Sequence, residues 1–114
     1  MNEYAPDAWQ VIQISTPDET IYKLFSTWYG GYTQGDSWRL NSGITSMKKI
    51  GKVYEVNGYS GSVYTVPDHE STYRTTVYTG SVLANLIEKS EYEIKVLPFN
   101  TDWENLIGEN HESH

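Results

Sequence analysis

The sequence predicts one mostly β domain, built as a strongly bent antiparallel sheet or small barrel with one short helix near residues 79–89. Three observations support this fold class. Six segments are rich in β-branched or aromatic residues, their connections are short, and one segment alone has a clear helical stripe. The 114 residues are typical of a single domain and can bury about two thirds of the surface that the unfolded chain exposes.

The first two segments are expected to form a hairpin. Residues 7–15 end in partly alternating β-branched residues, which indicate a strand, and residues 16–19 form a turn because Pro17 presets its backbone angle. Residues 20–29 fit two interpretations. Four apolar residues would share one helix face: Ile21, Leu24, Phe25 and Trp28. The β-favouring residues around them and the short turn favour a strand, which we prefer.

A glycine-rich loop over residues 30–36 precedes the longest β segment, residues 37–50. This segment is interrupted at Asn41-Ser42-Gly43, where we expect a bulge or a sharp bend. A glycine in the middle of a long strand is what a small barrel needs to turn a corner.

Two tight turns are expected next. Gly51-Lys52 leads into an alternating strand over residues 53–56, and Asn57-Gly58 is a strong hairpin-turn pair because both positions tolerate positive φ. The returning strand, residues 62–66, ends at Pro67, which has no amide hydrogen to donate.

The C-terminal part contains the helix. After a polar loop, residues 72–78 either extend a strand or lead into the helix, which Thr79 or Ser81 can cap. A last strand over residues 91–97 ends at Pro98. We therefore expect the domain to span residues 1–98, followed by an acidic and partly disordered tail, residues 99–114, anchored by Trp103.

The net charge of −7 is distributed unevenly. Residues 1–20 and 99–114 each carry four acids and no base, whereas residues 21–98 hold all eight bases and seven acids. The stretch from Ser37 to Tyr54 contains four bases and no acid: Arg39, Lys48, Lys49 and Lys52. It is either a solvated strand face or an anion-binding patch.

No motif in the chain predicts catalysis, a metal or a cofactor. The chain has no cysteine, which excludes disulfides and thiolate zinc sites. Gly58-Tyr59-Ser60-Gly61-Ser62 departs from the nucleophile-elbow pattern at its fifth position and is expected to be a turn. The side chains of Asp68-His69-Glu70 alternate in direction and do not converge on one ion. We therefore expect a protein that is not an enzyme.

Aromatic residues stand beside bases, an arrangement that single-stranded nucleic acid often uses. The candidate binding residues are the four bases above together with Trp38, Tyr54 and Arg74. The competing interpretation is that Trp38 and Tyr54 belong to the core or to a subunit interface, as the ten Tyr and four Trp of the chain suggest.

Several segments resemble a family of small uncharacterised proteins from cyanophages and marine metagenomes, over about residues 7–103. They are Trp28-Tyr29-Gly30-Gly31-Tyr32, Asp36-Ser37-Trp38-Arg39-Leu40-Asn41-Ser42-Gly43-Ile44, Gly58-Tyr59-Ser60-Gly61-Ser62-Val63-Tyr64 and Thr101-Asp102-Trp103. The resemblance implies a phage origin and a fold similar to Sm-like proteins, small bent barrels that pair edge strands into rings and often bind RNA. The Sm sequence signature itself is absent, so no RNA-contact residue is carried over.

Two hypotheses follow. The first is a ring-forming homo-oligomer that binds single-stranded nucleic acid, RNA in particular. The second is a protein-binding or virion-structural module, or an inhibitor of a host protein, whose partner is a host or phage protein. The N-terminus lacks a signal-peptide pattern and no apolar stretch approaches bilayer length, so we expect no membrane partner and a location in the host cytoplasm.

Overall fold

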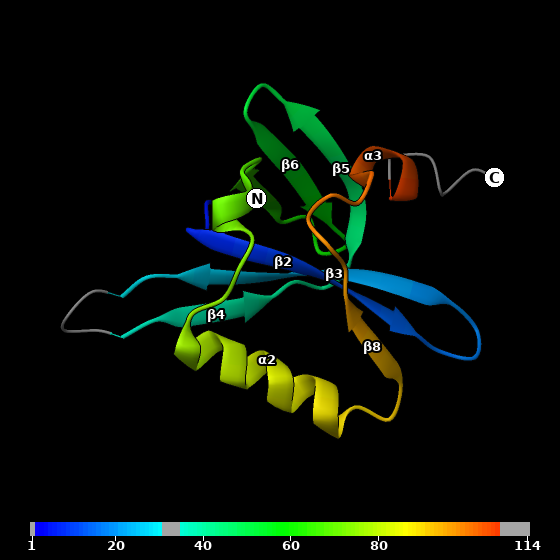
Figure 1. Cartoon of the computed structure of the whole chain (residues 1–114). Helices are drawn as coiled ribbons and strands as arrows, with labels where there is room; N and C mark the ends of the chain where they lie inside the picture. Colours follow the sequence, from blue (N-terminus) through cyan, green and yellow to red (C-terminus); the bar gives the residue numbers. More distant parts are fainter. Residues whose placement is uncertain (1, 31–34, 108–114) are drawn as a thin grey trace.

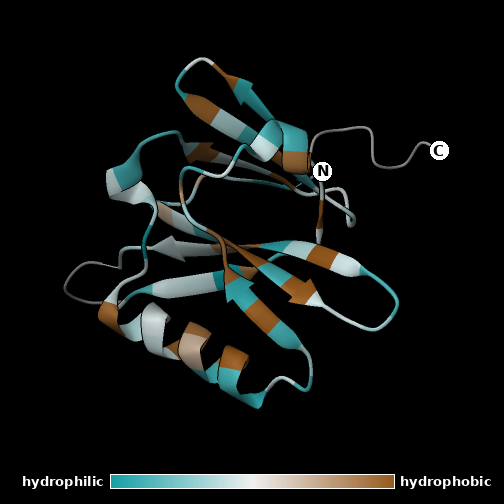
Figure 2. Cartoon of the chain, turned by 45° about the vertical axis from the view of Figure 1, so that its right-hand side comes forward, coloured by the Kyte–Doolittle hydropathy of each residue, from teal (hydrophilic) through white to brown (hydrophobic). Residues whose placement is uncertain are grey.

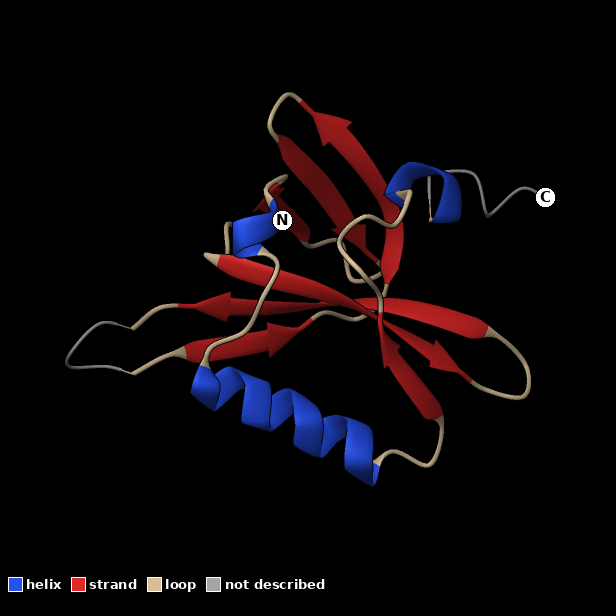
Figure 3. Cartoon of the chain, in the orientation of Figure 1, coloured by secondary structure: helices blue, strands red, loops and turns tan. Residues whose placement is uncertain are grey.

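The computed structural model describes residues 2–30 and 35–107 (Figure 1). The described residues contain eight strands in two four-stranded sheets, with one long helix, α2 (Val77–Lys89), packed against one sheet (Figure 3). The prediction of a mostly β chain is confirmed. The strands of the described part do not close into a barrel, so the expected Sm-like barrel is not found there.

The helix-backed sheet has the strand order β4-β3-β2-β8 and is antiparallel throughout. Its strands are β2 (Ala8–Ser15), β3 (Thr20–Trp28), β4 (Ser37–Leu40) and β8 (Glu93–Val96). The hairpin sheet has the order β1-β7-β6-β5. Its strands are β1 (Glu3–Tyr4), β5 (Ile44–Ile50), β6 (Val53–Gly58) and β7 (Val63–Pro67), with β1 parallel to β7.

The preferred interpretation of residues 20–29 as a strand is confirmed by β3. Successive side chains of β3 point to opposite layers, and both layers are apolar. Leu24 packs in the core between the two sheets, whereas Phe25 packs in the cluster beneath α2. Because this strand is buried on both faces, its apolar residues do not alternate strictly, and their spacing also fits one face of a helix.

The predicted bend at Asn41-Ser42-Gly43 is also confirmed. The chain leaves the helix-backed sheet at the end of β4 and enters the hairpin sheet at β5, so the bend joins two sheets and does not turn the corner of one barrel. Asn41 is 5 % exposed, and its Oδ1 accepts hydrogen bonds from the amides of Leu24 (2.8 Å) and Gly43 (3.2 Å). Gly43 has φ +134°, and a Cβ there would lie 2.7 Å from the Tyr59 ring, so glycine is required.

One of the two predicted turns is displaced. Gly51-Lys52 joins β5 to β6 as expected. The prediction of a turn at Asn57-Gly58 is wrong, because both residues lie in β6. The chain reverses two residues later, at Tyr59-Ser60, where the Gly61 amide donates to the Gly58 carbonyl (3.0 Å). Gly58 packs closely against the bend, since a Cβ there would lie 3.1 Å from the Asn41 amide nitrogen.

Helix α2 covers one face of the helix-backed sheet. It begins at Val77, two residues before the predicted start, and its N-cap is Thr76, not Thr79 or Ser81. Thr76 and Thr79 form a capping box, and the Thr79 hydroxyl also bonds the Thr27 hydroxyl of β3 at 3.0 Å. Leu83 is buried against the sheet, and Figure 2 shows further apolar residues, in brown, along α2 and the strands.

The main core lies between the two sheets and extends past residue 98. Trp103 is 1 % exposed and its ring lies 5.9 Å from that of Trp9, while Ile107 is equally buried. Helix α3 (Trp103–Leu106) begins at this tryptophan. Residues 99–107 therefore belong to the packed domain, because Trp103 and Ile107 form part of its core and Phe99 packs against it. Residues 108–114 of the expected disordered tail lie outside the described residues.

Candidate functional site

The predicted basic stretch is divided in space. Lys48 and Lys49 lie on β5 and Lys52 lies in the turn that follows. The ammonium group of Lys49 is 2.9 Å from the Asp68 carboxylate, whose hydrogen bond and charge raise the pKa of Lys49. Lys48 stands opposite Glu55 in the β5–β6 ladder. The hairpin lysines therefore share their surface with acids contributed by later parts of the chain.

Tyr54 lies at the margin of the core. It pairs with Lys49 in the ladder, and its ring is 6.2 Å from the ring of Trp9. The residue is half-buried, and this burial raises the pKa of the Tyr54 hydroxyl. A side chain packed in this way is not a free surface for base stacking.

Arg39 lies on β4, in the other sheet. Its Nε donates to the Tyr64 hydroxyl at 3.1 Å, and the guanidinium carbon lies 4.7 Å from the centre of the Tyr4 ring. Tyr4 and Tyr64 stack on each other at 4.8 Å. Burial raises the pKa of Tyr64, and the Arg39 hydrogen bond opposes that shift. Sequence reasoning did not find the two tyrosines, because the parallel β1–β7 pairing that joins them has no local sequence signal.

The last two candidates lie elsewhere. Trp38 is 38 % exposed and stacks on Phe25 at 5.7 Å, on the α2 side of the helix-backed sheet. Arg74 is exposed in the loop before α2, where its Nε donates to the Thr75 carbonyl at 3.5 Å. The structure thus gathers Lys48, Lys49, Lys52 and Tyr54 on one hairpin and places Trp38, Arg39 and Arg74 outside it.

The segment Asp68-His69-Glu70 is structural. Asp68 pairs with Lys49, and the Nδ1 atom of His69 accepts the Ser71 amide at the start of the short 3-10 helix η1 (Glu70–Thr72). Within residues 2–30 and 35–107, no three residues among His, Cys, Asp and Glu gather closely enough to hold a metal ion.

The outer edge of the hairpin sheet is blocked at β5. In the tight hairpin, the amide of Lys49 points away from β6, and it donates to the Glu104 carboxylate of α3 at 2.9 Å. The opposite edge of this sheet is β1, which is two residues long. Short edges and covered edges both hinder pairing with another chain.

Both edges of the helix-backed sheet are open in the described part of the chain. The amide of Asn41 bonds the carbonyl of Leu24, and the amide of Leu97 bonds that of Val11. Because antiparallel pairs alternate, Ser37 and Arg39 of β4 and Glu93 and Lys95 of β8 direct their backbone groups inward. Four residues direct theirs outward: Trp38, Leu40, Ile94 and Val96.

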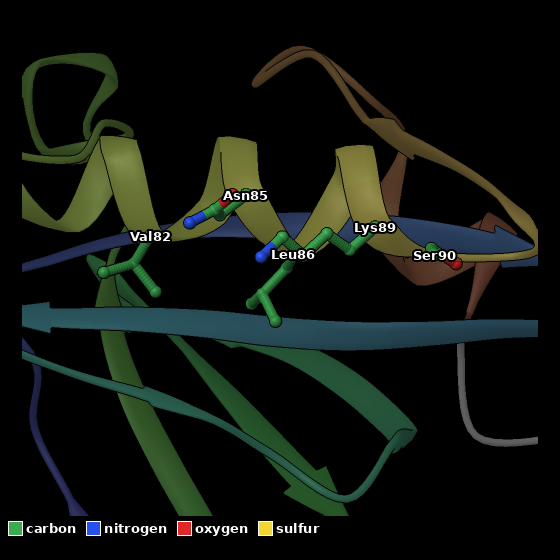
Figure 4. Close-up of a pocket in the computed structure, with 5 residues that line it drawn as sticks. All are labelled: Val82, Asn85, Leu86, Lys89 and Ser90. Atoms are coloured by element: carbon green, nitrogen blue, oxygen red, sulfur yellow. The ribbon is translucent and has the colours of Figure 1, made fainter.

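An open groove of about 490 Å³ runs beside α2. Figure 4 shows Val82 and Leu86 pointing from α2 toward β3. The groove is lined by Val82, Asn85, Leu86, Lys89 and Ser90. Val82 and Leu86 belong to the apolar cluster that also contains Leu40 of the open β4 edge. An apolar surface therefore adjoins unpaired backbone groups.

Comparisons of the chain with protein-family models, with curated proteins and with solved structures found no match. Among the described residues, no helix has the length and apolar character needed to cross a membrane.

Proposed function

We propose that the protein is a non-enzymatic assembly module whose copies join through the two open edges of the helix-backed sheet. The observation that carries this proposal is the contrast between the two sheets. Glu104 blocks the β5 edge, whereas Trp38, Leu40, Ile94 and Val96 present outward backbone groups on β4 and β8. Unpaired edge groups favour pairing with another strand.

The strand directions suit a head-to-tail contact. Each neighbouring pair in the order β4-β3-β2-β8 is antiparallel, so β4 and β8 run in opposite directions. The β4 strand of one copy can therefore pair with the β8 strand of the next and continue an antiparallel sheet. Such contacts generate a closed ring or an open filament. A ring agrees with the assembly implied by the resemblance to a phage family with an Sm-like fold.

The charges of the described residues support binding of nucleic acid less well than the strand edges support self-assembly. Phosphate binding depends on cations that are free to replace counterions. Here Asp68 pairs with Lys49, Glu55 faces Lys48, and the whole chain carries a charge of −7. A host or phage protein that joins the assembly fits this acidic surface better than RNA does.

The proposal is tested by light scattering behind size exclusion, with the 260/280 nm absorbance ratio recorded across the same peak. We expect the native protein to elute with a mass of at least twice that of one chain and with a protein-like absorbance ratio. Ile94→Pro removes an outward amide without removing a β2–β8 hydrogen bond, and we expect it to lower the mass. Ile94→Ala also loses the isoleucine side chain but keeps the amide, and it is the matched control.

A native protein that is monomeric at all concentrations would overturn the proposal. An oligomer with a raised 260/280 ratio that falls after nuclease treatment would restore nucleic acid as a ligand.

A further inference from the structure

We infer that copies of this chain pair β4 with β8 in one register, in which Arg39 of one copy lies opposite Glu93 of the next. The inference rests on the proposed function and names the contact that would perform it. The partner that we infer for the β4 edge is a second copy of this chain.

Backbone geometry restricts the choice of register. The outward residues of β4 are Trp38 and Leu40, and those of β8 are Ile94 and Val96. Outward residues must face one another to exchange hydrogen bonds, so allowed registers differ by two residues. Within the two strands, Trp38 therefore faces either Ile94 or Val96.

Charge distinguishes these two registers. With Trp38 opposite Ile94, Arg39 faces Glu93 and Ser37 faces Lys95. With Trp38 opposite Val96, Arg39 faces Lys95. Directly opposed like charges destabilise an antiparallel pair, whereas opposite charges stabilise it. The first register is therefore favoured.

The side chains also lie on suitable faces. Arg39 contacts Tyr64 and Tyr4 on the side of the hairpin sheet, so its orientation is already fixed in the single chain. Ile94 packs in the cluster beneath α2, so its neighbour Glu93 projects to the opposite face, the same one as Arg39. The two charges therefore meet on one side of the extended sheet.

The other side of the contact is apolar. Trp38 stacks on Phe25 beneath α2, and Val96 alternates to the same face as Ile94. Trp38 is 38 % exposed and Val96 is 39 % exposed in the single chain. Pairing of β4 with β8 would cover part of both exposed side chains, which the hydrophobic effect favours.

Charge reversal tests the register. Arg39→Glu and Glu93→Arg each place like charges opposite one another, and we expect each to weaken association by about tenfold. The double variant restores the pair and is expected to recover most of the native affinity. Lys95→Glu is the control: it faces Ser37 in the inferred register and leaves association nearly unchanged, whereas it would strengthen association in the alternative register. Failure of the double variant to recover, or stronger association of Lys95→Glu, would overturn the inference.

A second measurement does not depend on Arg39. Because the chain has no cysteine, Ser37→Cys with Lys95→Cys introduces the only thiols, at positions that face each other in a non-hydrogen-bonded pair with Cα atoms about 4.5 Å apart. Oxidation should give a ladder of covalent multimers on a non-reducing gel. Ser37→Cys with Glu93→Cys is the matched control. These two positions do not face each other in the inferred register, so this variant should form few covalent multimers.

The two proposals fail separately. A native protein that stays monomeric would overturn the assembly function itself. An oligomer in which the Ser37→Cys, Lys95→Cys variant forms no ladder would overturn the register alone.

Discussion

The backbone amide of Lys49 donates a hydrogen bond of 2.9 Å to the carboxylate of Glu104, and this contact covers the outer edge of β5. The position of Glu104 depends on Trp103, its neighbour in α3, which is buried in the core. The same fold leaves both edges of the other sheet open. The β5 edge is therefore protected, whereas the β4 and β8 edges are available for pairing.

Removal of this cover should open a third edge. We expect Glu104→Ala to form larger and more heterogeneous species than the native protein, because the outward amide of Lys49 on β5 becomes free to pair. Light scattering over several hours measures this change. Glu88→Ala, which removes an exposed acid on α2, is the control for charge. A Glu104→Ala variant with the same size distribution as that control would contradict the assignment.

The segment after residue 98 should be essential for stability. Trp103→Ala removes a side chain that is buried against Trp9 and Tyr73, and we expect it to lower the free energy of unfolding by about 3–5 kcal/mol. Tyr78→Ala, at an exposed position of α2, should cost less than about 1 kcal/mol. Urea titration of both variants measures the difference, and equal costs would contradict the placement of Trp103 in the core.

Stability should fall at alkaline pH because of Tyr73. Its hydroxyl donates to the Leu97 carbonyl and accepts the Val11 amide, and burial raises its pKa to about 12 from 10.0. The folded state thus favours the neutral form, so its contribution is complete below pH 10 and is lost as the pH rises toward 12. The loss amounts to about 2–3 kcal/mol.

Tyr73→Phe should reduce this pH dependence and should also lower stability at neutral pH by about 1–3 kcal/mol, because the Leu97 and Val11 groups lose a partner. Burial also raises the pKa of Tyr54 and of Tyr64, so some dependence remains in the variant. Urea titrations between pH 8 and 11.5 measure it. If the free energy of unfolding falls with pH equally steeply in the native protein and the variant, the role of Tyr73 is contradicted.

Asn41 should contribute more to the stability of the fold than its neighbour Ser42. Asn41→Ala leaves the amides of Leu24 and Gly43 without their acceptor inside the protein, at a cost of about 1–3 kcal/mol for each buried donor. Ser42 is exposed and its hydroxyl accepts the Ser60 amide, so Ser42→Ala should cost less than about 1 kcal/mol. Thermal unfolding of the two variants measures this order, and its reversal would contradict the account of the bend.

Local features of the fold were predictable from the sequence, and features that depend on distant contacts were not. The bend at residues 41–43 and helix α2 follow from glycine placement and apolar spacing. Asn57-Gly58 has the composition of a turn but lies in β6, where Asn57 pairs with both β5 and β7 and Gly58 pairs with β5. The anchoring of Trp103 was expected, but the parallel pairing of β1 with β7 and the packing of Ile107 into the core depend on residues far away in sequence.

The candidate site shows the same division. The sequence places Lys48, Lys49 and Lys52 in a stretch without acids, yet Asp68 and Glu104 reach that hairpin from positions well beyond it in the chain. The sequence predicts nucleic-acid binding by Trp38 and Arg39, and the structure places both residues on an open strand edge. The residue types were informative, whereas their role depends on sheet topology.

The most direct measurement of the central claim is amide hydrogen exchange at Trp38 and Ile94 as a function of protein concentration. Pairing of β4 with β8 between copies in the inferred register predicts that these two amides exchange slowly at concentrations where the protein assembles and rapidly after dilution. The inward amide of Lys95, which faces β2 in the single chain, should stay protected throughout. Rapid exchange of both outward amides at every concentration would contradict assembly through these edges.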